Sequence, residues 1–411
     1  MEKIDQWIAG IPQASSDAAV LPVHDPVSGE VYGQCPRGSA EDIDAAVAAA
    51  QAALPAWSGI SASQRAQWLN RLADAIEARS EAFSHCESRD TGKPMALVRD
   101  IEIPRAIANF RFFAAACTQS LDQAFHQEAG LNYTLHQPLG VVGVISPWNL
   151  PLYLLTWKLA PALAAGNCVI AKPSEITPMS ANLLARTAQE IGFPAGVLNI
   201  VQGSGETAGA ALVSHRGVKA ISFTGSTAVG HRIAATCADQ FKKVTLEMGG
   251  KNPALVFPDA PAQALKTLVR SAFQNSGQIC LCGSRILIHR AIYEDFKHAF
   301  VSEAERLKIG PPSDPETQLG PVMSEPHFRK VLSYIALARE EGGNILCGGD
   351  RVEPAECGGW FIAPTVIEGL PMGSRFCQDE IFGPVVSLHA FDDDNHALAL
   401  ANQSRYGLAA S

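Results

Sequence analysis

The chain contains 411 residues, of which 47% are hydrophobic and 18% are charged, and its formal net charge at pH 7 is −9. This length and composition suffice for a packed core and for two domains. The acidic balance disfavours general binding to nucleic acid or to an anionic membrane. The first ten residues lack a basic start followed by an apolar run, so we expect no secretory signal.

The ten cysteines are scattered along the chain. This pattern favours reduced thiols in the cytoplasm over a disulfide framework. Cys280 and Cys282 form the tightest pair, but no second pair follows at the spacing of zinc ligands, so we expect no metal. The longest apolar stretch, residues 151–166, is short for a membrane span and contains Lys158 and Pro161. It favours a buried helix near an active site.

The N-terminal part of the chain predicts two amphipathic helices. Residues 39–42 form a plausible capping box, and apolar residues follow it at helical spacing. A second stripe of apolar residues runs from Trp68 to Ile76. The polar stretch 128–133 leaves two alternatives open, a loop or part of an outlying hairpin.

From about residue 140, apolar runs of strand length alternate with helical segments. The predicted strands are 141–145, 168–171, 197–201, 220–223 and 244–246, and the predicted helical segments are 162–165, 179–191 and 228–237. A further round has a strand at 253–257, a helix at 262–274 and a strand at 285–288. Such alternation is typical of βαβ units with a parallel sheet, so we predict two α/β lobes with a boundary near Gly249 and Gly250.

Cys280 is a candidate nucleophile because it follows a Gly-Gln turn at the end of a predicted helix. Such a turn can present a thiol at the edge of a loop, and a thiolate attacks carbonyl carbons readily. Taken alone, however, a free cysteine is more often buried and inert.

Two polar side chains follow predicted strands and could assist a nucleophile. Glu247 ends an apolar strand before two glycines, where a carboxylate can act as a general base on water, although a solvated strand end is the simpler alternative. Asn149 stands between two prolines, and its amide could donate to a developing oxyanion, a contribution of about 3–4 kcal/mol in other systems. The alternative is an asparagine that stabilises its own turn.

The usual dinucleotide fingerprint G-x-G-x-x-G does not follow a strand in this sequence. Instead, residues 223–230 run from a strand through a Gly-Ser turn into a helix start, which suits a phosphate group. Lys172 and Glu175 follow another predicted strand and could hydrogen-bond ribose hydroxyls. Each of these signals is weak by itself.

Together these segments resemble the aldehyde dehydrogenase superfamily, over nearly the whole chain and in the family's order. The matching blocks are Pro147-Trp148-Asn149, Lys172-Pro173-Ser174-Glu175, Gly225-Ser226-Thr227 with Gly230, Leu246-Glu247-Met248-Gly249-Gly250-Lys251, Gly277-Gln278-Ile279-Cys280 and Glu380-Ile381-Phe382-Gly383-Pro384. The resemblance implies an α/β fold with a Rossmann-like cofactor lobe, a catalytic lobe and a small oligomerisation hairpin. The implied domains are 1–117 with 139–247 for NAD binding, 118–138 for the hairpin and 248–411 for catalysis.

The resemblance also implies a role for each candidate. Cys280 attacks the aldehyde, its backbone N–H and the Asn149 side chain hold the oxyanion, and Glu247 activates the water that releases the acid. Cys282 is a bystander. The implied cofactor is NAD, held by Ser146, Pro147, Trp148, Lys172, Ser174, Glu175, Gly205, Gly225, Ser226, Gly230, Glu380 and Phe382. Lys172 and Glu175 hold the adenosine ribose, Ser226 the pyrophosphate, and Glu380 and Phe382 the nicotinamide end. A carboxylate at position 175 repels a 2′-phosphate, which favours NAD⁺ over NADP⁺.

A narrower resemblance is to the 2-aminomuconate and 2-hydroxymuconate semialdehyde dehydrogenases. It is carried by residues 103–105, 109–113, 145–158 and 279–282. Their small-molecule substrate has a carboxylate far from the aldehyde, which an arginine can bind through two parallel hydrogen bonds. Arg105 is the candidate for this contact and Arg111 a weaker one, while a surface arginine is the alternative.

The chain ends at Ser411, within a motif after which family members normally continue, so a fragment and an entire chain both stay open. With the full C-terminus, the resemblance implies a cytoplasmic homodimer or homotetramer. Two alternatives to a semialdehyde dehydrogenase stay open. One is a dehydrogenase of another aldehyde, of the betaine or aliphatic type, and the other is a truncated, inactive member used for binding or structure.

Overall fold

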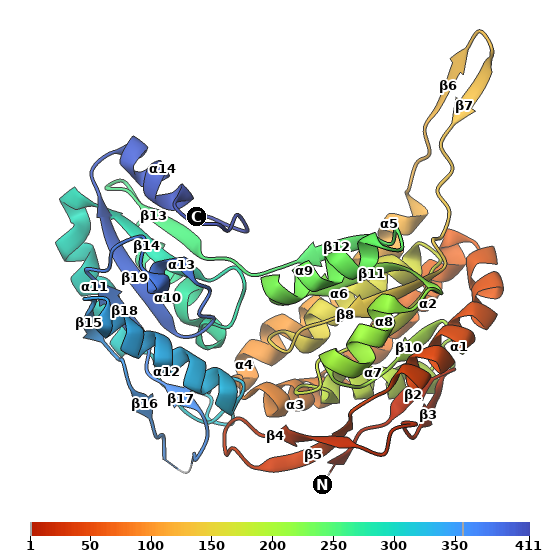
Figure 1. Ribbon diagram of the computed structural model, residues 1–411, viewed down its shortest axis with the longest axis horizontal. Helices are drawn as coiled ribbons and strands as arrows, with labels where there is room; N and C mark the ends of the chain where they lie inside the picture. The colour runs from red at the N-terminus through yellow and green to blue at the C-terminus, as the bar shows by residue number, and fades with distance from the viewer. Residues whose placement is uncertain (1, 356) are drawn as a thin grey trace. The chain divides into compact units, whose positions relative to one another are not determined.

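The computed structural model describes residues 2–355 and 357–411, and the chain divides into two compact units (Figure 1). Unit 1 consists of Met1–Val23, Val31–Asp90 and Ala96–Glu247, and unit 2 of His24–Glu30, Thr91–Met95 and Met248–Ser411. The sequence did not predict that two short early segments group with unit 2. They do so through long-range backbone bonds, such as those from Gly359 to Val27 and from Met95 to Pro312.

Unit 1 contains a mixed sheet with the strand order β12-β11-β8-β9-β10-β2-β3. The strands from β12 to β10 run parallel, and β2 and β3 continue the sheet in antiparallel fashion. The strands are β2 (Gln6–Ile8), β3 (Ile11–Gln13), β8 (Val141–Ile145), β9 (Cys168–Lys172), β10 (Leu198–Ile200), β11 (Val218–Thr224) and β12 (Lys243–Glu247). The prediction of an α/β fold with a parallel-rich sheet is confirmed.

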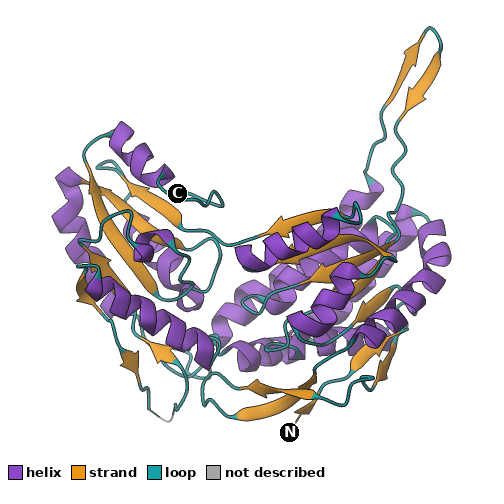
Figure 2. Cartoon of the chain, in the orientation of Figure 1, coloured by secondary structure: helices purple, strands orange, loops and turns teal. Residues whose placement is uncertain are grey.

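Helices surround this sheet (Figure 2). They are α1 (Ala40–Gly59), α2 (Ala62–Glu77), α3 (Ser80–Thr91), α5 (Ile103–Thr118), α6 (Pro151–Ala164), α7 (Met179–Glu190), α8 (Ala210–Ser214) and α9 (Thr227–Ala238). The predicted capping box opens α1, because Ser39 Oγ accepts from the Asp42 N–H and the Asp42 carboxylate accepts from the Ser39 N–H. The apolar stretch predicted as a buried helix forms α6.

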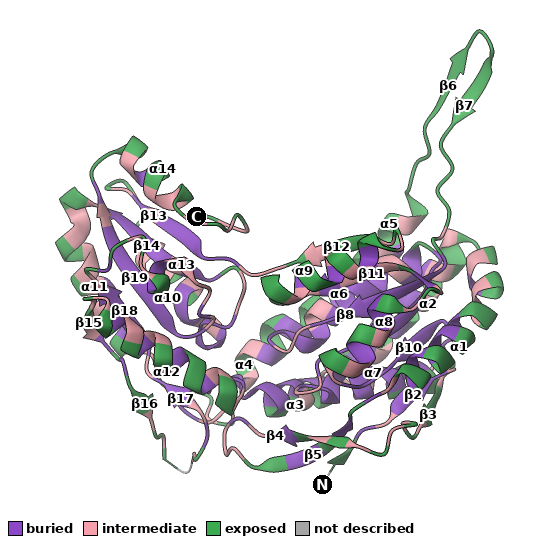
Figure 3. Ribbon diagram, viewed as in Figure 1, coloured by how far each residue is buried: buried purple, intermediate pink, exposed green. Residues whose placement is uncertain are grey.

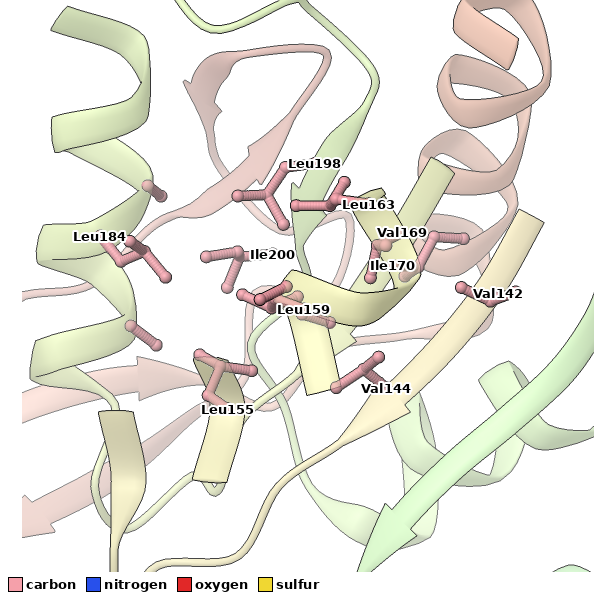
Figure 4. Packing of buried hydrophobic residues seen from close by; sticks show 14 of the residues in the cluster. Val142, Val144, Leu155, Leu159, Leu163, Val169, Ile170, Leu184, Leu198 and Ile200 are labelled. Carbon is pink, nitrogen blue, oxygen red and sulfur yellow. The ribbon is translucent and has the colours of Figure 1, made fainter. Parts of the chain in front are cut away.

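The core of unit 1 lies where α6 packs against β8 and β9 (Figure 4). Leu155, Leu159 and Leu163 of α6 are fully buried, and Val144 and Ile170 meet them from the sheet (Figure 4). Each fully buried aliphatic side chain contributes about 1.5–3 kcal/mol relative to its exposed state. This packing holds the strand ends that carry the site residues.

Two smaller β structures belong largely to unit 1. The strands β1 (Glu2–Lys3), β5 (Val31–Pro36) and β4 (Val20–His24) form one sheet. The strands β6 (Ala124–Gln127) and β7 (Gly130–Tyr133) pair as an exposed antiparallel hairpin (Figure 3). Of the two alternatives for the polar stretch near residue 130, the structure therefore shows the hairpin.

Unit 2 is built on a sheet with the strand order β13-β14-β19-β18-β15, parallel except for β15. Its elements are β13 (Asn252–Val256), α10 (Ala264–Phe273), β14 (Gly283–His289), α11 (Tyr293–Glu305), α12 (Glu325–Glu340), β15 (Asn344–Cys347), β16 (Arg351–Val352), β17 (Phe361–Ile362), β18 (Thr365–Glu368), α13 (Arg375–Gln378), β19 (Val385–Phe391) and α14 (Asp394–Asn402). The short helix α4 (Met95–Leu97), π-helical turns at Val98–Glu102 and Gly205–Gly209, and 3-10 turns at Gln274–Gly277 and Arg290–Ile292 complete the described chain. None of the described helices combines the length and apolar character needed to cross a membrane.

Candidate active site

The carboxyl ends of four parallel strands of unit 1 meet at one edge of its sheet. In the register, Ile145 at the end of β8 pairs with Lys172 of β9, and Thr224 at the end of β11 pairs with Glu247 of β12. The loops that follow these strands therefore leave the sheet side by side. This is the edge at which ligands bind in parallel α/β sheets.

Asn149 lies in the loop that joins β8 to α6. The backbone N–H of Ser146 donates to the Lys172 carbonyl oxygen at 3.3 Å, which ties the start of this loop to β9. Asn149 itself is only 4% exposed, while Pro147 and Trp148 are half-buried. The helix begins at Pro151, whose fixed φ suits the first turn. The loop therefore holds the Asn149 amide in a constrained, largely dry position.

Glu247 is exposed at the end of β12, where its carbonyl oxygen accepts from the Gly225 N–H at 3.0 Å. Lys158, a buried residue of α6, donates from Nζ to Ser222 Oγ on the neighbouring strand at 3.1 Å. Burial lowers the Lys158 pKa to about 8, although the Glu247 carboxylate acts in the opposite direction. An amine with such a pKa can exchange protons near neutral pH.

Lys172 and Glu175 form a partly buried ion pair at the end of β9. Lys172 Nζ donates to Glu175 Oε2 at 3.0 Å and to the Gly203 carbonyl oxygen at 2.6 Å. Burial by itself would raise the Glu175 pKa, but the Lys172 ammonium and the backbone N–H groups of Glu175 and Gly205 lower it overall. The carboxylate is therefore ionised and held in one orientation. Ser174 beside it is buried.

Gly225 and Ser226 form the turn between β11 and α9. Ser226 is the N-cap of α9, and its Oγ accepts from the Val229 N–H. A side chain at position 225 would overlap the Phe223 ring, so this turn requires glycine. The N-terminus of α9 offers backbone N–H groups and the positive end of the helix dipole, which suit a phosphate. Gly230 is buried in the first turns of the same helix.

In unit 2, Cys280 follows a tight turn that ends α10. Asn275, Ser276 and Gly277 all have left-handed φ angles, between 52° and 71°. A side chain at position 277 would overlap the carbonyl oxygen of Gly383. This reversal brings the chain back toward β14 and leaves Cys280 half-buried on the connecting loop.

Two buried amide side chains hold the Cys280 loop. Asn252 Nδ2 donates to the carbonyl oxygens of Cys280 at 2.7 Å and of Cys282 at 3.0 Å. Gln278 donates from Nε2 to the Asn275 carbonyl oxygen and accepts from the Met323 N–H at its Oε1. The backbone on both sides of the thiol is therefore fixed, which is the condition for a positioned nucleophile.

Cys280 lines a pocket of about 340 Å³, part of which is open to solvent. Gly250, Gly277, Glu380 and Phe382 also line it. Glu380 Oε1 accepts from the Gly250 N–H at 3.3 Å, and a side chain at Gly249 would overlap the same carboxylate. The pocket thus brings a thiol and a carboxylate together within unit 2.

The segment 380–382 is held from α12. Lys330 Nζ donates to the Glu380 carbonyl oxygen at 3.1 Å, and His327 Nε2 lies 2.6 Å from the Phe382 carbonyl oxygen. Burial lowers the His327 pKa to about 4, so the imidazole is neutral and donates through Nε2. Phe382 has a φ of +66°, a strained conformation for a bulky residue, which these contacts stabilise.

Lys251 is a buried cation beside this pocket. It is 2% exposed, and among the described residues its Nζ atom has no hydrogen-bond partner. The Nζ atom lies 5.1 Å from the centre of the Phe376 ring. Burial lowers the Lys251 pKa to about 7, so the charge on this amine changes close to neutral pH.

Arg105 is exposed on α5 in unit 1. Its Nη2 donates to the Tyr153 hydroxyl oxygen at 3.0 Å, and its guanidinium lies 5.3 Å from the centre of the Tyr153 ring. Arg111, the weaker candidate, forms ion pairs with Asp74 and Glu77. The Arg105 guanidinium keeps donors available for an anion, whereas that of Arg111 is already committed to two carboxylates.

The structure thus collects the predicted residues into two groups, one in each unit. Cys280, Glu380 and Phe382 line one pocket of unit 2, and the residues from 146 to 247 lie at one edge of the unit 1 sheet. Sequence reasoning did not identify Lys158, Lys251, Asn252, Gln278 and His327 as parts of the site. An ionisable residue within an apolar helix was a usable signal for Lys158, and Lys251 and Gln278 stand inside the matching blocks. Asn252 and His327 depend on long-range contacts.

Comparison with known proteins places these motifs in a family. The model of the aldehyde dehydrogenase family matches residues 13–411. The chain is 48% identical to 2-aminomuconic semialdehyde dehydrogenase of Danio rerio, over 94% of this chain and 81% of that protein. It is 42% identical to 2-hydroxymuconic semialdehyde dehydrogenase of Pseudomonas sp. strain CF600, over 100% of this chain and 87% of that protein. The NAD⁺ complex of an aldehyde dehydrogenase from Bacillus cereus superposes with a TM-score of 0.97 at 37% identity, covering 100% of this chain and 84% of that one. The chain therefore belongs to the aldehyde dehydrogenase family.

Proposed function

We propose that the protein oxidises an aldehyde to a carboxylic acid with NAD⁺, through a thioester on Cys280. The observation that carries this proposal is the half-buried Cys280 thiol, fixed by Asn252 in a pocket that also contains Glu380. The family membership and the names of the similar proteins support it.

Catalysis begins when the Cys280 thiolate adds to the aldehyde carbon. The carbonyl π electrons move to oxygen, and a thiohemiacetal alkoxide forms. The Asn149 amide and the Cys280 backbone N–H donate to this oxygen, and removal of one such donor typically costs about 10²–10³ in rate. The buried environment of Asn149 strengthens its hydrogen bond because little water competes for it.

Collapse of the alkoxide expels a hydride from the former aldehyde carbon and leaves a thioester on Cys280. NAD⁺, when bound, supplies the hydride acceptor. Glu247 then takes a proton from water as the water oxygen attacks the thioester carbon, and the Cys280 thiolate leaves. Lys158, whose pKa is about 8, is suited to pass on the proton that Glu247 collects.

The residues at the edge of the unit 1 sheet fit a dinucleotide. The fixed, ionised Glu175 carboxylate can accept from two ribose hydroxyls, and Lys172 adds a donor. Ser226 and the N-terminus of α9 suit the pyrophosphate. A 2′-phosphate next to Glu175 would be repelled, so we propose NAD⁺ rather than NADP⁺. The proposed cofactor site is completed by Ser146, Pro147, Trp148, Ser174, Gly205, Gly225, Gly230, Glu380 and Phe382.

The proposed substrate is 2-aminomuconic or 2-hydroxymuconic semialdehyde. The names of the similar proteins support this class. The carboxylate at the far end of such a substrate requires a cation, and Arg105 is exposed with its guanidinium oriented by Tyr153. The alternative is an aldehyde of the betaine or aliphatic type, for which a free guanidinium offers no advantage.

The roles of the units form part of the same proposal. Unit 1 binds the cofactor, unit 2 carries the nucleophile, and the exposed hairpin of residues 118–138 mediates association into a homodimer or homotetramer. Leu121, Phe125, Leu131 and Tyr133 are all more than half exposed in this hairpin, which supports its use as an interface. We propose a cytoplasmic location because the cysteines of the chain are free thiols.

The deciding experiment measures NADH formation at 340 nm with 2-hydroxymuconic semialdehyde. Cys280→Ala should abolish turnover, and the matched control Cys282→Ala should retain it. Glu247→Gln should release about one equivalent of NADH per active site in a burst and then stop, because the thioester cannot be hydrolysed. Unchanged turnover in Cys280→Ala would refute the proposed chemistry.

A second measurement tests the substrate class. Arg105→Ala should raise the KM for the carboxylated semialdehyde about tenfold or more and leave the KM for an aliphatic aldehyde such as hexanal unchanged. Arg111→Ala serves as the control because its guanidinium is paired with Asp74 and Glu77. An equal effect of Arg105→Ala on both aldehydes would favour the alternative substrates.

A further inference from the structure

Helix α3 presents two buried carboxylates, Glu87 and Asp90, that lie one turn apart. Glu87 Oε1 accepts from the Leu152 N–H at 2.7 Å, and Asp90 Oδ2 accepts from the Met179 N–H at 2.8 Å. Both acidic residues have an exposed fraction of 0%. Each carboxylate thus contacts the first turn of a different helix, α6 or α7.

These contacts replace caps that the local sequence does not supply. The first N–H groups of a helix lack partners within the helix, and a side-chain oxygen at the N-cap usually satisfies one of them. The N-cap positions of α6 and α7 are Leu150 and Pro178, whose side chains contain no hydrogen-bond acceptor. A carboxyl oxygen from α3 serves as the acceptor instead.

The two capped helices directly follow the two loops of the proposed site. Leu152 is three residues after Asn149, the proposed oxyanion donor. Met179 is four residues after Glu175, the proposed ribose ligand, and Asp90 is additionally bonded to the Tyr32 hydroxyl. A shift of the first turn of α6 would therefore move Asn149, whereas a shift of α7 would move the ribose loop.

We propose that Glu87 is a positioning residue that holds Asn149 in place through its hydrogen bond to the first turn of α6. This inference rests on the proposed function, because it assigns Glu87 to the oxyanion step of that reaction. Glu87 acts through Asn149 and touches no reacting atom. A hydrogen bond of 2.7 Å in a buried environment is strong enough for this task. Misplacement of a catalytic group by 1 Å can cost about 100-fold in rate.

The test is a double-mutant cycle between positions 87 and 149. Glu87→Met should lower kcat about 10- to 100-fold with little change in the KM for the aldehyde. In an Asn149→Ala background, Glu87→Met should cause no further loss, because the group that it positions is already gone. Glu87→Gln, which retains an oxygen acceptor, should recover most of the activity. An equal loss of kcat in both backgrounds would overturn the proposal.

Hydrogen exchange provides a readout that does not depend on activity. Glu87→Met should speed amide exchange in residues 146–154 and leave residues 172–179 unchanged, whereas Asp90→Leu should do the reverse and weaken NAD⁺ binding. Unchanged exchange at 146–154 would overturn the positioning role. If Glu87→Met does not fold, Glu87→Asp retains the carboxyl group, retracts the acceptor by one methylene and should show the same pattern to a lesser degree.

The outcomes distinguish this inference from the proposed function. Retained turnover in Cys280→Ala refutes the function, whatever the exchange data show. Loss of turnover in Cys280→Ala and Asn149→Ala, combined with wild-type kcat in folded Glu87→Met, upholds the function and refutes the positioning role.

Discussion

Nζ of Lys172 lies 3.0 Å from Oε2 of Glu175 and 2.6 Å from the carbonyl oxygen of Gly203. One buried ammonium thus joins the loop after β9 to the loop after β10. The ion pair fixes the direction of the Glu175 carboxylate before any ligand arrives, so less conformational freedom is lost when a ribose binds.

Glu175→Gln should change the preference between the two nicotinamide dinucleotides. Removal of the negative charge should raise kcat/KM for NADP⁺ about tenfold and lower it for NAD⁺, because repulsion of the 2′-phosphate disappears together with a strong acceptor. Steady-state assays with both cofactors measure this ratio. Glu190→Gln, at the exposed end of α7, is the control and should leave the ratio unchanged. An unchanged ratio in Glu175→Gln would exclude this carboxylate as the discriminating group.

Limited alkylation should distinguish Cys280 from Cys282. Burial raises the Cys282 pKa to about 12, and this side chain is 9% exposed. At pH 8 its thiolate fraction is on the order of one in 10⁴, so iodoacetamide should react slowly with it. We expect peptide mass spectrometry to find label on the half-buried Cys280 well before Cys282. Equal labelling rates would contradict the described environments of the two thiols.

Gly277→Ala should destabilise unit 2 strongly. A residue with a side chain at a φ of +71° costs about 1–3 kcal/mol, and the new Cβ would also overlap the Gly383 carbonyl oxygen. Urea unfolding should therefore show a loss above about 3 kcal/mol. Gly342→Ala is the matched control. Its φ is +89°, but among the described residues, its own chain neighbours apart, no atom lies within 4 Å of the position that the new methyl group would occupy. Similar losses of unfolding free energy in both variants would show that the overlap between the new Cβ and the Gly383 carbonyl oxygen does not destabilise the protein.

Lys251→Met should stabilise the protein, most strongly at low pH. The wild-type lysine has a pKa of about 7 when folded and 10.5 in its ordinary state. Below pH 7 the buried amine must carry a charge without a hydrogen-bond partner among the described residues, which a methionine avoids. Thermal unfolding of both proteins between pH 6 and pH 10.5 measures the difference.

The sign of this pH dependence follows from proton counting. Between pH 7 and pH 10.5 the unfolded lysine binds more protons than the folded one, so the free energy of unfolding of the wild type rises with pH. The advantage of Lys251→Met should therefore be largest below pH 7 and shrink toward pH 10.5. A difference that is constant across this range would mean that folding does not change the Lys251 pKa.

The elements predicted from sequence are those whose stability comes from local pattern. The strands β8, β9 and β11, the buried helix α6 and the capping box at Ser39 were all predicted, because apolar runs and side-chain caps act over a few residues. The early strands β2 to β5 were not. They are short, and although β2 pairs with the adjacent β3, this hairpin joins the main sheet only through a distant partner, because Trp7 pairs with Ile200.

The same limit applies to the site. The local sequence places Cys280, Glu247 and Asn149 at turns and strand ends, and the order of the motifs along the chain assigns their roles. The local sequence gives no signal for Asn252 and Glu87. Asn252 bonds a backbone group 28 residues away, and Glu87 bonds one 65 residues away. The order of the motifs therefore identifies the groups proposed to react, whereas the groups that hold them become visible only when the chain is folded.

The Asn252 side chain also has a mechanical consequence. Its Nδ2 donates to the carbonyl oxygens of Cys280 and Cys282, and its Oδ1 accepts from the Ala409 N–H at 3.2 Å. A single planar amide thus connects the segment 409–411, which pairs with β13, to the loop of the thiol. Because the amide is planar and rigid, a displacement of residues 409–411 is transmitted to the Cys280 backbone. A fusion partner or surface tether that displaces the backbone near residue 411 would consequently also displace the backbone of Cys280.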